Sequence, residues 1–211
     1  MPRVSRSNPL ALAVLVSLYE RPMHPYEVAQ TLRERAKHDS VRLNYGSLYS
    51  VVESLEKRRL IAAQETVREG RRPERTVYAI TDAGEREFVD WLSELVSVPV
   101  KEYPQFEAAL SFIVALPPDD ALELLKMRAN QLELTVAQAH AGLQRVQEFG
   151  LPRVFELETE YHLRLLEAEL DWARTIIKDI ESGSLDGLGL WRGFHDGTVP
   201  ADFKWTPQSP D

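Results

Sequence analysis

The stretch that decides the fold is residues 44–61, which read NYGSLYSVVESLEKRRLI. Apolar side chains recur in it at steps of three and four from Leu48 to Leu55, which predicts a helix with one buried stripe. Asn44 is a typical N-cap, because its side chain can accept a hydrogen bond from the first helical turn. Polar and aromatic side chains on the rest of this helix are left for contacts with a partner: Tyr45, Ser47, Tyr49, Ser50 and Lys57.

Two shorter helices are expected before this one. The first starts after Asn8 and is apolar on most sides, so it is expected to be central and buried. Its apolar run is far too short to span a membrane, and we expect no membrane partner. The second helix, about residues 26–37, has one apolar stripe and ends in a basic segment.

An arginine-rich hairpin is expected after the third helix. Residues 60–66 and 76–80 read as strands, and Gly70 and Pro73 mark a turn between them. Three helices followed by a hairpin is the order of a winged helix-turn-helix, whose third helix enters the major groove of DNA. Arginine pairs with phosphate oxygens through its planar fork, so three residues are predicted phosphate contacts: Arg71, Arg72 and Arg75.

Three motifs in this region are similar to those of one known family. Residues 46–61 resemble the recognition helix of the PadR family of transcriptional regulators, and residues 24–27, HPYE, resemble the opening of its second helix. Residues 70–84, GRRPERTVYAITDAG, resemble the wing and the start of the next helix. The resemblance covers residues 8–96 and implies DNA binding, with relief of repression by a small-molecule effector.

Two positions depart from the family pattern. Ser50 stands where the family often has proline, and Arg59 stands where it often has glycine. Glycine favours a left-handed backbone after a helix, and another residue pays about 1 kcal/mol in that conformation. Either the turn after the recognition helix differs here, or this protein tolerates the strain.

Charge divides the chain into a basic and an acidic part. Residues 1–80 carry 14 Lys and Arg against 9 Asp and Glu, whereas residues 81–211 carry 11 against 24. A basic N-terminal part fits nucleic-acid binding, although the net charge of the whole chain is −8. There is no cysteine, which excludes disulfides and thiolate chemistry and agrees with a cytoplasmic protein.

The C-terminal half is predicted to be a helical dimerisation domain. Apolar residues follow a heptad pattern from Leu122 to Val146 and again from Leu163 to Ile180, which predicts two long packed helices. We expect a mostly α (α+β) fold with a winged helix at 1–97, a dimerisation and effector domain at 98–183, and a Gly/Pro-rich aromatic tail at 184–211 that can dock on the body. The dimer contacts are assigned to Leu163, Leu166, Leu170, Ile177 and Ile180.

Weaker signals concern small ligands. Trp91, Tyr161 and Trp172 could line an effector pocket, although such aromatics are more often core. Glu158 and His162 are spaced i, i+4, but no third ligand falls in register, so neither a metal nor another cofactor is expected.

The sequence thus predicts a sequence-specific transcriptional repressor, and not an enzyme. It would bind an inverted-repeat operator in double-stranded DNA as a homodimer, with a small-molecule effector that relieves repression. Two alternatives stay open. One is a winged-helix module for protein interaction that has lost DNA binding, against which the four arginines of the hairpin argue. The other is an enzyme that uses Glu158 and His162.

Overall fold

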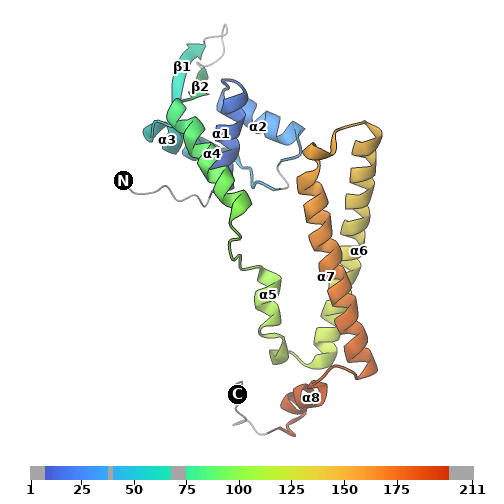
Figure 1. Cartoon of the computed structure of the whole chain (residues 1–211). Helices are drawn as coiled ribbons and strands as arrows, with labels where there is room; N and C mark the ends of the chain where they lie inside the picture. Colours follow the sequence, from blue (N-terminus) through green and yellow to red (C-terminus); the bar gives the residue numbers. More distant parts are fainter. Residues whose placement is uncertain (1–7, 38–39, 68–74, 200–211) are drawn as a thin grey trace. The chain divides into compact units, whose positions relative to one another are not determined.

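The computed structural model describes residues 8–37, 40–67 and 75–199 (Figure 1). The chain divides into two compact units, Met1–Glu102 and Tyr103–Asp211. Within the described ranges, no helix combines the length and the apolar character needed to cross a membrane.

The first unit is a winged helix-turn-helix, as the sequence predicts. Its elements in chain order are α1 (Pro9–Glu20), α2 (Pro25–Glu34), α3 (Tyr45–Lys57), β1 (Ile61–Val67), β2 (Arg75–Ile80) and α4 (Asp82–Ser97). Helix α1 is central and contributes four buried apolar residues to the core, which it shares with α2, α3, β1 and α4. The expectation of a buried first helix is therefore confirmed.

Side-chain caps set where the helices begin. Asn8 accepts a hydrogen bond from the backbone N–H of Leu10, at 3.1 Å, and Asn44 accepts one from Ser47, at 2.7 Å. His24 opens α2 with a capping box, in which the Glu27 carboxylate accepts from the His24 N–H at 2.8 Å. These caps satisfy backbone donors that would otherwise lack partners in the first turn.

The hairpin is antiparallel and pairs Ile61 with Ile80, with an irregularity between Ala63 and Glu65. Met23, between α1 and α2, adds a one-residue bridge, because it exchanges two backbone hydrogen bonds of 3.0 Å with Tyr78. The base of the wing is thereby tied to the helical core.

Helix α4 begins against the end of α3. Thr81 caps it by accepting a hydrogen bond from the Gly84 N–H at 3.1 Å, and its own hydroxyl lies 2.8 Å from the carbonyl oxygen of Arg59. Gly84 passes so close to Leu60 that a Cβ atom at this position would lie 2.0 Å from the Leu60 carbonyl oxygen. This contact requires glycine for steric reasons.

The second unit is a long helical hairpin with short helices at its open end. Its elements are α5 (Gln105–Leu110), the 3-10 turn η1 (Ile113–Ala115), α6 (Pro118–Glu148), the 3-10 turn η2 (Arg153–Phe155), α7 (Leu157–Ser182) and α8 (Leu188–Asp196). The segment before α6 is divided into the short helix α5 and the turn η1. The two long helices agree with the predicted heptad segments.

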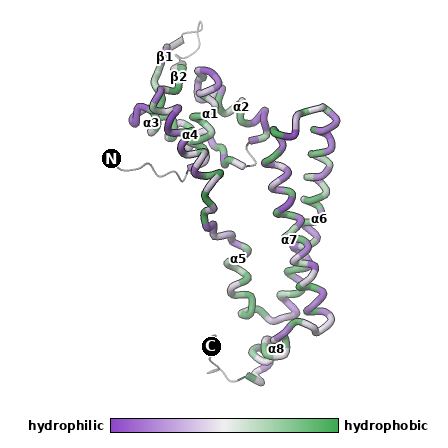
Figure 2. The backbone as a smooth tube through the Cα atoms, in the orientation of Figure 1, coloured by the Kyte–Doolittle hydropathy of each residue, from purple (hydrophilic) through white to green (hydrophobic). Residues whose placement is uncertain are grey.

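Apolar residues of α6 and α7 meet in a continuous seam. Hydrophobic and hydrophilic residues alternate along both helices (Figure 2). Ala129 and Leu132 of α6 pack with Leu170 and Ala173 of α7, and ion pairs flank this seam. Among them, Arg174 and Glu133 approach to 2.7 Å. The heptad pattern therefore reports an interface within one chain.

Helix α8 docks on the open end of the hairpin. Trp191 is buried, and its indole N–H donates a 2.8 Å hydrogen bond to the carbonyl oxygen of Leu116. The Nε2 atom of His195 lies 2.9 Å from the carbonyl oxygen of Val114. The sequence left the structure of this tail undetermined; Phe203 and Trp205 lie outside the described residues.

Candidate nucleic-acid interface

Helix α3 buries one stripe and exposes the rest of its surface. Leu48, Val51, Val52 and Leu55 pack in the core, as the spacing predicts. Four of the predicted DNA-contacting side chains on this helix are exposed: Tyr45, Tyr49, Ser50 and Lys57. The fifth, Ser47, is half-buried. The helix thus presents both hydroxyl and aromatic groups to a partner.

A groove with both polar and apolar walls runs along one side of α3. It has a volume of 640 Å³ and is lined mainly by α3 and by the start of α1, with Ser47, Ser50, Ser54 and Arg58 on the α3 side. The Ser50 hydroxyl donates to the carbonyl oxygen of Gly46 at 3.0 Å, so its oxygen lone pairs remain available as acceptors. This side of α3 can therefore exchange hydrogen bonds with base edges or phosphates.

Lys57 is engaged within its own helix. Its ammonium lies 2.9 Å from the Glu53 carboxylate, and this hydrogen bond raises the pKa of Lys57 and lowers the pKa of Glu53. Both side chains are largely exposed, so the pair is weak and can be exchanged for a phosphate. The predicted DNA contact of Lys57 would need that exchange.

Tyr45 lies in an aromatic and cationic cluster that the sequence analysis missed. Its ring stacks on Tyr26 with centroids 6.2 Å apart and an interplanar angle of 9°. Arg33 donates a 2.6 Å hydrogen bond from Nη1 to the Tyr45 hydroxyl. Tyr26 and Arg33 are seven residues apart on α2 and share a helical face, and this spacing was the signal in the sequence that could have revealed them.

The turn after α3 resolves one of the questions left by the sequence. Arg59 adopts the left-handed conformation, with φ of 59°. The Leu60 N–H donates to the Leu55 carbonyl at 3.0 Å, and the Arg59 N–H donates to Glu56 at 2.8 Å. These two bonds form a Schellman motif. The protein therefore keeps the turn expected of glycine and tolerates an arginine in it.

The wing is described only at its base. The backbone of Arg75, the first residue of β2, pairs with Val67. Arg71 and Arg72 lie outside the described residues, and the phosphate contacts assigned to the three wing arginines stay predictions.

Arginines of the described N-terminal unit fall into two groups. Arg35 pairs with Glu20 through two hydrogen bonds of 2.5 and 2.7 Å, and Arg21 and Arg58 also face carboxylates. The other group has no carboxylate partner among the described residues and consists of Arg33, Arg42, Arg59 and Arg86. Arg33 and Arg42 precede the start of α3 in the chain, so they join the candidates for anion contacts.

The residues assigned to dimerisation lie in the seam of the hairpin. Leu163, Leu170 and Ile180 are buried in a single chain. The other two, Leu166 and Ile177, are partly buried and pack against the same seam. In this structure all five stabilise the pairing of α6 with α7, and their contact with a second chain stays a prediction.

The three aromatic residues assigned to an effector pocket belong to different helices of the chain. Trp91 is buried in the first unit, on α4, whereas Tyr161 and Trp172 are on α7. The last two are eleven residues apart, which corresponds to about 16 Å along a helix. Trp172 contacts Phe106 of α5 edge to face, with ring centroids 5.9 Å apart. A shared pocket of these aromatics stays a prediction.

A different pocket in the second unit is apolar. It has a volume of 230 Å³ between α5, η1 and α6, and Arg128 is the charged residue in its wall. The Arg128 guanidinium lies over the Phe106 ring, 3.5 Å from its centroid, and also pairs with Glu169 at 2.5 Å. Sequence periodicity could not reveal this pocket, because it depends on how α5 folds back on α6.

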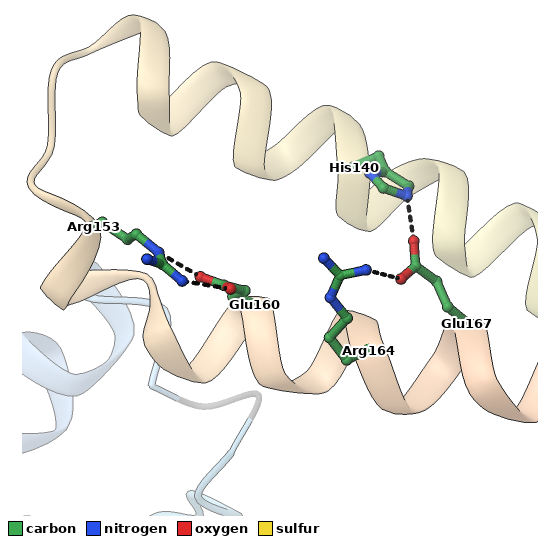
Figure 3. Close-up of polar contacts among 5 residues, drawn as sticks. All are labelled: His140, Arg153, Glu160, Arg164 and Glu167. Carbon is green, nitrogen blue, oxygen red and sulfur yellow. Dashed lines mark hydrogen bonds and ion pairs between the residues drawn. The ribbon is translucent and has the colours of Figure 1, made fainter.

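Polar side chains gather at the closed end of the hairpin (Figure 3). Arg153 makes two hydrogen bonds of 2.9 Å to Glu160. Glu167 accepts a 3.1 Å hydrogen bond from Arg164, and it lies 2.9 Å from His140 of α6. The two arginines are each paired with a carboxylate, and because both arginine side chains are largely exposed, these pairs contribute little to stability.

Glu158 and His162 do not extend into a metal centre in the described part of the chain, where no group of three potential ligands comes together. The alternative reading of these two residues as an enzyme site thus gains no support from geometry.

Comparison with known proteins agrees with this architecture. Residues 14–90 match the model of the PadR-like family of transcriptional regulators. The negative transcriptional regulator PadR of Bacillus subtilis is 21% identical over 179 residues, which cover 82% of this chain and 94% of that protein.

Solved structures show the same fold. Bacillus subtilis PadR in complex with operator DNA has a TM-score of 0.66 at 20% identity, covering 82% of this chain and 99% of that one. The same regulator in complex with p-coumaric acid has a TM-score of 0.66 at 18% sequence identity, covering 82% of this chain and 98% of that one. A PadR-like regulator from Bacillus cereus has a TM-score of 0.56 at 17% sequence identity, covering 82% of this chain and 99% of that one. The winged-helix part of this chain, residues 14–90, thus matches the PadR-like family of transcriptional regulators, and the fold of the chain is similar to that of solved PadR regulators.

Proposed function

We propose that this protein represses transcription by binding an operator in double-stranded DNA through α3 and the wing. The observation that carries the proposal is the exposed surface at the start of α3, where Tyr45, Ser47, Tyr49 and Ser50 are left free of the core. The first turns of a recognition helix are the part that usually reaches base edges. The similarity to a negative regulator that has been solved with operator DNA supports the direction of control.

The residues divide between reading and holding DNA. The Ser47 hydroxyl can donate to and accept from base edges, and the Ser50 hydroxyl, whose proton goes to Gly46, can accept from them. The wing arginines Arg71, Arg72 and Arg75 would contact phosphates, which position the protein without specifying sequence. Bound at a promoter, such a protein would exclude the transcription machinery.

Selection of bound fragments from random DNA tests this proposal. The wild-type protein should enrich one motif, and the double variant Ser47→Ala, Ser50→Ala should enrich a changed or weaker motif, since a lost base contact costs roughly 1–3 kcal/mol. The matched control is Ser93→Ala, Ser97→Ala on α4, which should enrich the wild-type motif. Failure of the wild-type protein to bind any DNA with salt-dependent affinity would refute the function.

The protein is proposed to act as a homodimer on an inverted repeat. The surface available for a second copy is the apolar stripe of α7 that faces away from the seam: Leu157, Tyr161, Leu165 and Trp172. The spacing places all four residues on one side of the helix. Two of them are largely exposed, Tyr161 by 67% and Leu165 by 51%. An exposed apolar stripe of this kind is typical of a protein interface.

Light scattering on stripe variants tests the dimer. Tyr161→Ser, Leu165→Glu should leave the helical content unchanged and halve the molar mass. Leu170→Ala, inside the seam, should instead destabilise the hairpin by about 2–5 kcal/mol. A stripe variant that stays dimeric would place the interface elsewhere.

A small-molecule effector is proposed to relieve repression. The support is the relative solved with p-coumaric acid, together with the apolar pocket that Arg128 borders. A set of small aromatic acids can be screened for release of the protein from its selected operator. Leu124→Trp, which would fill this pocket, should abolish release without loss of DNA binding. Release that persists in this variant would locate the effector elsewhere, including at Trp91, Tyr161 or Trp172.

A further inference from the structure

The cluster of Tyr26, Tyr45 and Arg33 joins α2 to the first residue of α3. Tyr45 lies parallel to Tyr26, and the Arg33 guanidinium carbon is 4.8 Å from the centroid of the Tyr45 ring. All three side chains are exposed, including 49% of Tyr26 and 38% of Tyr45. Such an exposed arrangement contributes little to the core, so its place beside the DNA-reading helix calls for a functional explanation.

The charge of Arg33 is available. Arg35, two residues further along the chain, is held by Glu20, whereas no carboxylate pairs with Arg33 within the described residues. One hydrogen bond of Arg33 goes to the Tyr45 hydroxyl, which leaves most of its five N–H donors free. A guanidinium that is held by a tyrosine and has no carboxylate partner in the described part of the chain is suited to bind a phosphate oxygen through its fork.

We propose that Arg33 is a phosphate-binding residue of the DNA interface and that Tyr45 is its positioning residue. This inference deepens the proposed function and rests on it. Tyr45 holds the guanidinium through its hydroxyl oxygen, and Tyr26 holds the Tyr45 ring by stacking. Tyr45 therefore acts on the phosphate only through Arg33, by keeping the guanidinium in place.

A positioning role for Tyr45 differs from a base-reading role in its effect on DNA binding. A tyrosine that reads a base edge would alter the preferred sequence when it is replaced. A tyrosine that fixes a phosphate ligand alters affinity for all sequences alike, because phosphates position a protein without specifying bases. The two roles therefore predict different results for one variant, Tyr45→Phe, which keeps the ring and removes the hydroxyl.

Binding measured by fluorescence anisotropy over a range of salt concentrations tests the proposal. On the selected operator and on random-sequence DNA, Arg33→Ala should weaken binding about tenfold. The slope of log K against log salt should become shallower by about 1 per protomer. The charge control is Arg86→Ala on α4, which also lacks a carboxylate partner in the described chain and should keep the wild-type slope.

A double-mutant cycle tests the positioning role. Tyr45→Phe should weaken binding in the wild-type background and have almost no further effect when Arg33 is already alanine, because the two side chains act as one unit. Its selected DNA motif should be that of the wild-type protein. Thermal unfolding of each variant should match that of the wild type, which separates a binding role from a purely structural one.

Clear results would overturn the proposal. Wild-type affinity and salt slope in Arg33→Ala would remove Arg33 from the interface. Fully additive effects of the two substitutions, or a changed motif in Tyr45→Phe, would show that Tyr45 acts on DNA by itself. In each case the wild-type protein still binds DNA, so the failure is distinct from failure of the proposed function.

Discussion

Two single residues of the first unit end their helices in a left-handed backbone conformation. Ala36, after α2, and Arg59, after α3, both end their helices with positive φ, 54° and 59°. At both ends the next residue donates its N–H back to the last helical turn, Lys37 to Leu32 and Leu60 to Leu55. These bonds and the burial of Leu60 hold the left-handed residues in place, although neither of them is glycine.

Arg59→Gly is expected to stabilise the protein by about 0.5–1 kcal/mol. A non-glycine residue in the left-handed conformation costs roughly 1–2 kcal/mol, and glycine avoids this cost. Part of the gain is lost, because glycine also makes the unfolded chain more flexible. Urea unfolding without DNA measures the change. Lys57→Gly, at the last residue of α3, is the control and should instead destabilise the protein, because glycine disfavours helix. Two shifts of the same sign would contradict this account.

Gly84→Ala is expected to destabilise the protein by about 3 kcal/mol or more, because the new Cβ would collide with the Leu60 carbonyl. The control is Gly142→Ala in α6, where a Cβ would meet nothing within 4 Å. That variant should be more stable by about 0.5–1 kcal/mol, since alanine favours helix. Circular dichroism during thermal unfolding measures both. A well-tolerated Gly84→Ala would mean that α4 can move away from Leu60.

At the scale of elements, the closed end of the α6–α7 hairpin depends on ionised side chains. The hydrogen bonds from Arg153 hold the pKa of Glu160 below its ordinary value of 4.5. A lowered folded-state pKa means that this pair stabilises the hairpin above the unfolded-state pKa. The contribution is lost as the pH falls through the lower, folded-state pKa.

Glu160→Gln should therefore lower the melting temperature slightly at about pH 7, and the difference from the wild type should vanish in acid, below the lowered pKa of Glu160. The effect is expected to be small, because the Arg153 side chain is largely exposed. Arg153→Gln should behave in the same way, and the double variant should add nothing further. A difference between Glu160→Gln and the wild type that persists in acid would assign the effect to something other than this ion pair.

At the scale of the whole molecule, each unit has a core of its own. The first core lies among α1, α2, α3, β1 and α4, and the others lie between helices of the second unit. A fragment that ends at Glu102 should consequently fold alone. It would retain α3 and the wing and lack the surface proposed for the second copy.

We expect that fragment to be monomeric and to bind an intact inverted repeat about 10²–10⁴ times more weakly than the full chain. Two linked recognition helices would reach successive major grooves roughly 34–36 Å apart, whereas one reaches a single half-site. On an isolated half-site the two proteins should differ much less. Light scattering and anisotropy give both answers, and a fragment that dimerises would place the interface in the first unit.

Local patterns in the sequence determined much of this protein. The apolar spacing of α3 and the caps Asn8 and Asn44 predict the helices of the first unit correctly, whereas the turn residues Gly70 and Pro73 lie outside the described residues. The heptad segments predict the two long helices. These features could be predicted because each depends on residues a few positions apart, which one turn of helix or one hairpin brings together.

Tertiary structure alone decided what those elements contact. The heptad leucines of α7 face α6 of the same chain, because a seam of this kind is satisfied by any apolar helix, and the pattern does not say which chain supplies it. Tyr45 meets Arg33 because α2 and α3 pack together, whereas Arg35, two residues further along the chain, pairs with Glu20. Such pairings join residues that are distant in sequence, and only the packed chain fixes their geometry.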